Sequence, residues 1–483
     1  MSQKGTGALP KILSRAFLLL LLCIPPSFAD SRDTNLITPH TTQQPGSFKL
    51  IRSDEDYSAF IDPALRHGVL DEIKFISLNA DGSSYLTLGG QFREEFEYFK
   101  FKNWGLYQTP DTRLKTRFME STDFHFGTDN RIFIELKSGF LNLNSQGPGV
   151  NDVDHLAFNQ IFYDHVWHVG KDETLTVRPG MSELDYGSER LISVRENANI
   201  RLGFLGLKTL FKFGNNRMDT FWVFPMQTNP GVFEDYATAG RQLWSNYVML
   251  HPKPFDVDVY YFGFRNDFAS FAIGPGLELR HSFGLRVANE QSRNKNGFDF
   301  DAEGVYQFGS YNDLPVSAFL LDIDPGYSIG NLPWSPRFGL KAGAGSGDHN
   351  QGQGTVGTFD PLFPRSGYLD LSGSLGQTNI LNINPYLNLR PSEHWRLATG
   401  LGMFWRESDQ DGIYTPGMAL IRGPGGSRAR YVGSEATVTA SFRTSKHLNL
   451  VAGYAYFSAG NFIAETGPDT ATRYGQLHVY FIF

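Results

Sequence analysis

Apolar and polar residues alternate along most of this chain, and the alternation is clearest at the C-terminus. The apolar face there carries an aliphatic or aromatic residue at every second position: Leu477, Val479, Phe481 and Phe483. The intervening positions, from Gln476 to Ile482, are more polar. A period of two predicts an extended strand with unlike faces. A strand that ends the chain on an aromatic residue is typical of the closing strand of a bacterial outer-membrane β-barrel.

The connections between the predicted strands alternate between short and long. Short connections are expected at 127–130, 168–173, 214–216, 391–395 and 444–447, and long ones at 346–379, 408–430 and 461–474. Barrels of this class place short turns in the periplasm and long loops outside. The first strand is expected over 85–100, and the count from there reaches about 18 strands, an even number as in other single-chain barrels. Between 243 and 323 the alternation is irregular, and the count is open there by about two strands.

The position of the charged residues predicts which face of each strand is turned to lipid, because a lipid-facing Arg or Lys at the midplane costs about 2 to 4 kcal/mol. Over 396–406 both arginines share a face opposite Leu397 and Leu401. Odd-numbered and even-numbered residues of a strand lie on opposite faces, and we call this rule strand parity. It predicts that the following arginines face inward: Arg93, Arg117, Arg131, Arg280, Arg286, Arg390, Arg396, Arg406 and Arg443. Acidic residues accompany them, so we expect a polar, water-filled interior with a modest excess of arginine, which favours anions. A soluble β-sandwich would need a second sheet over this charged face, and nothing remains to form one.

The first thirty residues predict export. Basic Lys4, Lys11 and Arg15 precede the apolar run 16–24, and the small residues Ser27 and Ala29 form a cleavage site, which is the pattern of a signal peptide. We therefore expect a signal peptide over 1–29, a periplasmic N-terminal leader over 30–84 and the barrel over 85–483.

The leader itself does not alternate in its first part, 30–74. Ser53 or Asp54 is expected to begin a short helix there, as the N-cap of an acidic first turn. The leader is then either a plug or docking arm for a periplasmic partner, or an ordered segment against the barrel mouth.

Composition excludes several other classes of protein. The 483 residues include 51 Gly, 41 Phe and 21 Tyr, and only 19% are charged, which is unlike a disordered chain. A net charge of −7 without any run of Lys and Arg argues against nucleic-acid binding. After residue 29 no apolar stretch is long enough for a membrane-spanning helix.

No catalytic motif of the zinc-protease, P-loop or serine-hydrolase type occurs, so no enzyme and no cofactor are expected. The scattered His155, His165 and His168 do not form a metal site. Asp409, Asp411 and Gly412 resemble part of a calcium loop whose later acidic ligand is missing. We therefore expect at most an incidental Ca²⁺ in the outer loops.

Several segments resemble the bacterial alginate export family, the outer-membrane barrels that release the polyuronate alginate. The segments are 85–95, 183–193 with its continuation to Arg201, 345–348 and 358–364. The likeness extends from about residue 75 to 483 and implies a monomeric barrel of 18 strands with an arginine-rich lumen. It adds Arg178, Arg190, Arg195 and Arg201 to the predicted substrate path. Met181 stands where the family pattern has an arginine, so the resemblance is specific for the family and not for the substrate.

These observations predict a channel in the outer membrane of a Gram-negative bacterium. We expect passive export of an anionic exopolysaccharide, an alginate-like polyuronate, through an arginine-containing lumen. The expected partners are the polysaccharide, the lipid bilayer with its lipopolysaccharide, the barrel insertion machinery and a periplasmic secretion scaffold protein. The alternative is a porin for uptake of small anionic or sugar solutes.

Overall fold

A computed structural model describes residues 47–289 and 295–483 of the chain. The predicted signal peptide and its cleavage after Ala29 lie outside these residues. Among the described residues no helix is both long and apolar enough to cross a membrane.

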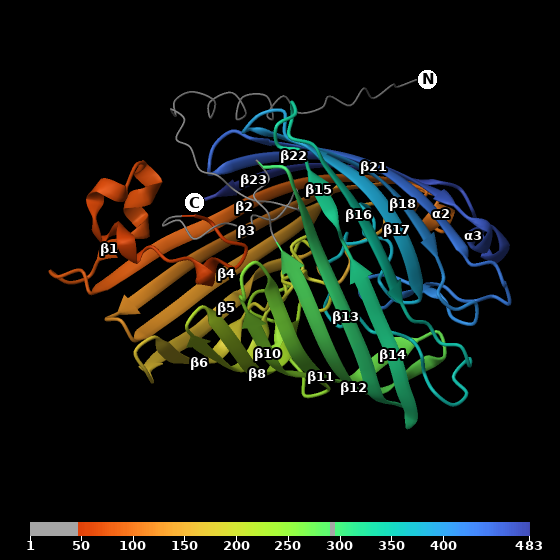
Figure 1. Ribbon diagram of the computed structural model, residues 1–483, viewed down its shortest axis with the longest axis horizontal. Helices are drawn as coiled ribbons and strands as arrows, with labels where there is room; N and C mark the ends of the chain where they lie inside the picture. The colour runs from red at the N-terminus through yellow and green to blue at the C-terminus, as the bar shows by residue number, and fades with distance from the viewer. Residues whose placement is uncertain (1–46, 290–294) are drawn as a thin grey trace, which may run out of the picture. The chain divides into compact units, whose positions relative to one another are not determined.

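Within the described residues, 18 antiparallel strands form a closed barrel (Figure 1). Successive strands are neighbours, and the barrel closes between β2 (Ser84–Lys100) and β23 (Thr472–Ile482), where Phe92 lies opposite Phe481. The predicted all-β barrel and its closing strand are therefore confirmed. Closure leaves no unpaired strand edge, which is the condition for a sheet to exist in lipid.

The other barrel strands follow in chain order. They are β3 (Asp111–Phe126), β4 (Asn130–Asn142), β5 (Asp154–His168), β6 (Glu173–Ser182), β7 (Phe204–Phe213), β8 (Asn216–Gln227), β10 (Arg241–Leu250), β11 (Asp256–Phe271), β12 (Gly274–Asn289), β13 (Gly297–Tyr311), β14 (Leu314–Ile323), β16 (Arg337–Gly345), β17 (Ile380–Leu389), β18 (Trp395–Trp405), β21 (Tyr431–Arg443) and β22 (Leu448–Ala459). Short strands pair beside them or within loops: β1 (Ile76–Ser77), β9 (Tyr236–Ala237), β15 (Gly326–Ser328), β19 (Ile413–Tyr414) and β20 (Leu420–Arg422). Two short helices, α2 (Lys102–Gly105) and α3 (Asn461–Thr466), lie in loops.

The two ends of the barrel differ in their connections. We call the end at which β2 begins and β23 finishes the turn end, and the opposite end the loop end. The five predicted short turns all lie at the turn end, and the three predicted long connections all lie at the loop end. The last of these is shorter than expected, because β23 already begins at Thr472.

The irregular region between 243 and 323 has a physical explanation. Two connections at the loop end, 272–273 and 312–313, contain only two residues. Asn312 and Asp313 have φ values of 46° and 67°, which suit the tight hairpin turns that match the twist of paired strands. The connections therefore no longer alternate between short and long, although successive strands still alternate in direction.

The N-terminal segment, residues 47–83, folds against the turn end without forming an α-helix. It contains four 3₁₀ turns: η1 (Arg52–Asp54), η2 (Ser58–Ile61), η3 (Pro63–Leu65) and η4 (Val69–Lys74). The predicted helix beginning at Ser53 or Asp54 is wrong, because both residues lie inside η1 and the chain is extended again at Glu55. Tyr57, Phe60 and Phe75 instead pack on Tyr85 at the start of β2.

The faces of the strands alternate as their sequence predicts. Leu477 is 58% exposed on the outside, whereas Gln476 and His478 are each 5% exposed and point inward. Apolar residues therefore face the lipid side, and polar residues face the interior.

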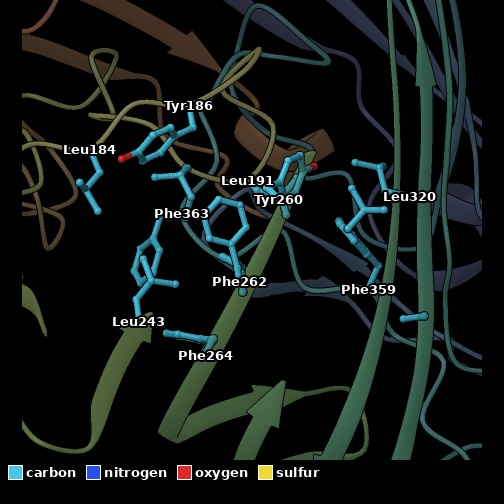
Figure 2. Packing of buried hydrophobic residues seen from close by; sticks show 14 of the residues in the cluster. Leu184, Tyr186, Leu191, Leu243, Tyr260, Phe262, Phe264, Leu320, Phe359 and Phe363 are labelled. Carbon is cyan, nitrogen blue, oxygen red and sulfur yellow. The ribbon is translucent and has the colours of Figure 1, made fainter. Parts of the chain in front are cut away.

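The interior, however, is not polar throughout. The loop 183–203 between β6 and β7 and the loop 346–379 between β16 and β17 fold into the barrel and carry apolar residues with them. Leu184, Tyr186 and Leu191 of the first loop belong to one buried cluster with Tyr260 and Phe262 of β11 (Figure 2). The expectation of a wet lumen all round is thus wrong on the side of β8 and β10–β14. Parity within strands could not show that loops supply the missing cover.

Candidate pore and its charged lining

The two inward loops hold each other inside the barrel. Ile192 and Phe363 form a parallel bridge, in which the Ser193 amide donates to the Phe363 oxygen at 2.9 Å and the Phe363 amide donates to the Leu191 oxygen at 2.8 Å. The rings of Phe204 and Phe264 meet the Phe363 ring edge-on at centroid distances of 5.3 and 5.4 Å. The bridge therefore satisfies backbone hydrogen-bonding groups, and the ring contacts bury apolar surface. A loop inside the barrel requires both.

Three of the predicted arginines converge on one carboxylate of loop 183–203. Glu196 lies 2.5 Å from Arg117, 2.5 Å from Arg201 and 3.7 Å from Arg93. Arg93 also donates to the backbone oxygens of Glu196 and Ala198 at 2.5 and 2.7 Å. All these side chains are almost fully buried, so they are not open to a solute; Arg93 and Arg117 anchor the loop to β2 and β3, and Arg201 pairs with Glu196 within the loop.

A second ion-pair network holds the same loop on the opposite wall. Arg190 lies 2.9 Å from Asp301, 2.8 Å from Glu303 and 3.2 Å from Asp322. Arg286 joins the network through Asp301 at 2.6 Å and Asp258 at 3.1 Å. Charges paired in this way fix the loop in position.

Four more predicted arginines are also engaged by the protein. Arg131 pairs with Asp123 at 2.7 Å, Arg178 with Asp164 at 2.7 Å and Arg280 with Glu278 at 2.5 Å. Arg406 has another role, because its guanidinium donates to four backbone oxygens of the loop 406–430. These oxygens belong to Asp409, Asp411, Ser427 and Ala429.

Arg195 differs from the others. Within the described residues it makes no ion pair, and its guanidinium lies over the Phe363 ring at 5.4 Å. Burial, together with the nearby positive charge of Arg241, lowers the pKa of Arg195 to about 10, so it stays charged at neutral pH.

A cavity of about 730 Å³ lies along the part of the wall formed by β16–β18, β21–β23, β2 and β3. Its lining includes Arg390 and Arg396 at the turn end, and Tyr107 and Gln146 from loops at the loop end. The cavity therefore follows the barrel obliquely between the two ends. Of the thirteen predicted path arginines, only Arg390 and Arg396 line it, and Arg443 lies at the turn end nearby, where its amide donates to the His394 oxygen at 2.9 Å.

The lining carries more cations than acids. The basic residues are Lys102, Arg113, Lys115, Lys341, Arg365, Arg390 and Arg396, and the acidic ones are Glu95, Glu97, Asp111, Asp370 and Glu435. On β2 and β3 the lining acids outnumber the bases by one, and Lys115 is shared between Glu95 at 3.0 Å and Glu97 at 2.6 Å. On β16 Lys341 makes no ion pair within the described residues, and its ammonium lies 4.9 Å from the Tyr368 ring.

Lys341 and Arg365 are lining residues that the sequence interpretation missed. Lys341 shares parity with Arg337 on β16, so the argument used for the other strands would have found it. Arg365 lies in loop 346–379, where no parity applies, and its partner Glu189 at 3.6 Å belongs to the other inward loop.

The segment that resembles part of a calcium loop connects neighbouring loops through hydrogen bonds. The Asp411 carboxylate accepts hydrogen bonds from the Asp348 amide at 2.9 Å, the Thr358 hydroxyl at 2.7 Å and the Tyr414 hydroxyl at 2.6 Å. No group of three or more His, Cys, Asp or Glu in the described part of the chain is arranged to hold a metal.

Comparison with known proteins agrees with this architecture. The sequence pattern that defines the alginate export family matches residues 84–476. The chain belongs to the alginate export family. A search of curated proteins finds no match.

Several solved outer-membrane barrels have a similar fold at low sequence identity. OccAB1 of Acinetobacter baumannii has a TM-score of 0.58 at 10% identity, covering 86% of this chain and 99% of its own. OccK5 (OpdH) of Pseudomonas aeruginosa has a TM-score of 0.53 at 10% identity, covering 82% and 98%. The outer membrane protein OpdK of the same species has a TM-score of 0.54 at 9% identity, covering 82% and 98%. This alginate export family member is an outer-membrane channel.

Proposed function

We propose that this channel exports an anionic exopolysaccharide of the alginate type, and that the polymer passes along the 730 Å³ cavity. The observation that carries the proposal is the cationic strip formed by Lys341, Arg365, Arg390 and Arg396 along that cavity. A polyuronate carries one carboxylate per sugar, so a row of cations lowers the barrier to its entry.

The rest of the lining suits weak binding. On β2 and β3 Lys115 is shared by Glu95 and Glu97, and the acid left in excess opposes tight binding of a polyanion. Tyr368 and Tyr386 add aromatic faces near Lys341, and sugar rings present apolar faces to such side chains. Conduction needs binding favourable enough for entry and weak enough for release. The arginines buried around Glu196 and near Asp301 support this path indirectly, by holding the loops that bound it.

Uptake of small anionic or sugar solutes is the second candidate function. The packed half of the interior and the N-terminal segment at the turn end favour it, because both narrow the space left for a polymer.

Reversal potential across a planar bilayer under a salt gradient tests the role of the cationic strip. We expect the wild-type channel to prefer anions and the double variant Lys341→Gln, Arg396→Gln to shift toward cations. The matched control is Arg428→Gln, Arg473→Gln, which removes the same charge from exposed positions outside the cavity. A cation-selective wild-type channel that the double variant leaves unchanged would overturn the proposal.

Oligouronates of increasing length separate the two functions. If a polymer follows the cavity, longer oligomers block the current for longer, because more carboxylates meet the strip at once. If only single sugars and dimers block, uptake of small solutes is the better account.

A further inference from the structure

A second cavity, of about 1220 Å³, lies at the turn end on the side of β3–β8. Residues 49–58 of the N-terminal segment form one wall. The turns 127–130, 214–217 and 251–256 contribute to the other. In the predicted orientation this cavity lies at the periplasmic mouth. Of the predicted path arginines, only Arg131 and Arg178 line it.

The barrel side of this second cavity has more positive than negative charge near β7 and β8. Lys208 and Arg217 share a single carboxylate, Asp219, at 3.1 and 2.6 Å. The Tyr186 hydroxyl donates to the same carboxylate at 2.7 Å. Lys212, one of the lining residues, makes no ion pair among the residues that the structure describes. Arg178 is matched by Asp164 at 2.7 Å, so the surplus among the lining residues of β7 and β8 comes from Lys212 and from Arg217, whose partner Asp219 is shared with Lys208.

Asp54 of η1 lines the same cavity as Lys212 and Arg217. Its neighbour Ser53 holds the turn in place, because the Ser53 backbone oxygen accepts from Arg131 at 2.8 Å and the Ser53 hydroxyl donates to Gln160 at 3.2 Å. The Asp54 carboxylate itself has no ion pair or hydrogen bond within the described residues. Asp54 is exposed to solvent; desolvation by the surrounding protein would raise its pKa, but the charges of Arg217, Arg178 and Lys208 outweigh this and lower that pKa.

We propose that the turn-end cavity is an entry site for carboxylates of the exported anion, and that the Asp54 carboxylate competes with them for the positive charge of the cavity. This deepens the proposed function and rests on it. A uronate carboxylate has the same charge as Asp54 and can contact Lys212 and Arg217 directly, which Asp54 does not. Because no direct pair has to break, an incoming carboxylate competes with Asp54 only through the field of the shared cations. The acidic turn then weakens binding at the mouth, so that a bound carboxylate is released again.

Binding of a short oligouronate to the full-length protein in detergent, measured by titration calorimetry, tests this assignment. Asp54→Asn is nearly isosteric and removes one like charge, so we expect Kd to fall about five-fold at low salt and less at high salt. Lys212→Gln should raise Kd in both the wild-type and the Asp54→Asn background. Glu72→Gln, which removes an exposed carboxylate of the same segment outside the cavity, should leave Kd unchanged.

The outcomes distinguish this inference from the proposed function. If oligouronate blocks the channel and Asp54→Asn leaves Kd unchanged, the entry site is wrong and the proposed function stands. If Glu72→Gln lowers Kd as much as Asp54→Asn, the effect is one of overall charge and the site is wrong as well. If oligouronate neither binds nor blocks in any variant, both proposals fail.

Discussion

Arg52 donates a hydrogen bond from Nη2 to the backbone oxygen of Phe483 at 2.7 Å, across 431 residues of sequence. The same guanidinium lies 3.1 Å from Glu55, so one side chain joins the N-terminal segment to the last residue of the chain. The segment is thereby tied to the strand that closes the barrel.

Arg52→Gln should loosen the N-terminal segment without opening the barrel. A charge-assisted hydrogen bond of this kind contributes about 1.5 to 3 kcal/mol, so we expect limited proteolysis within 47–75 to become at least several-fold faster. Arg473→Gln, at an exposed position near the loop end, is the control. Equal cleavage rates in the two variants would contradict the role of Arg52.

Phe483→Asp should deplete the protein from outer membranes. The Phe483 ring lies against the outer face of β2 at Gly90, where an added Cβ would come within 2.6 Å of the ring. A charge there costs up to about 1 kcal/mol near the interface. We also expect the insertion machinery to recognise the terminal aromatic residue. Phe483→Tyr keeps the aromatic and should assemble normally. Normal amounts of folded barrel in the Asp variant would show that the last residue is dispensable.

Glu196→Gln should destabilise the folded barrel. Arg93, Arg117 and Arg201 would keep their charges but lose the carboxylate that they share, and breaking a buried ion pair from one side costs about 3 to 5 kcal/mol. The temperature at which the barrel unfolds in detergent, read from its altered gel mobility, measures the loss. Glu72→Gln, an exposed carboxylate, should leave that temperature unchanged. An unchanged temperature in Glu196→Gln would mean that loop 183–203 is held by its apolar contacts alone.

Docking of the N-terminal segment should strengthen as pH rises from about 7 to 10. Burial, with the positive charge of Arg52 nearby, lowers the pKa of Lys74 from 10.5 to about 7, while Glu55 and Asp71 oppose this shift and Lys446 adds to it. The undocked segment binds the proton more tightly, so the stabilisation is full above the unperturbed pKa and is lost as pH falls to about 7. Hydrogen exchange of residues 47–75 measures it. Lys74→Met should abolish this pH dependence, and its persistence in that variant would assign it to another group.

The orientation of the barrel can be read from cysteine labelling, because the chain has one cysteine, Cys23, which the signal-peptide prediction removes. A membrane-impermeant maleimide should label Gln353→Cys and Arg428→Cys on intact cells. It should label Glu393→Cys, in the turn between β17 and β18, only after the outer membrane is permeabilised. Labelling of Glu393→Cys on intact cells would reverse the topology.

The barrel was predictable because its rule is local. Alternation in each strand reports lipid on one side, and Leu477 against Gln476 shows how faithfully the two faces separate. The length of a connection is a weaker guide, because a tight hairpin such as Asn312–Asp313 at the loop end interrupts the alternation of short and long connections.

The interior was not predictable from the same rule. The alternation within strands shows that Arg280 or Arg286 is not on the lipid side, but it does not show whether water or a carboxylate faces the guanidinium. The pairing of Arg190 with Asp301, Glu303 and Asp322 is set by long-range folding of a loop. For that reason charge on the inner face is a good guide to orientation and a poor guide to the pore.

The bore of this channel is set by two loops and not by the number of its strands. Loops 183–203 and 346–379 join through Ile192 and Phe363 and occupy one side of the barrel. Substitutions in these loops therefore change the shape of the passage. They leave the lipid-facing surface unchanged, and with it the assembly of the barrel in the membrane. A change in the width of the passage therefore needs no change in the strands that face the lipid.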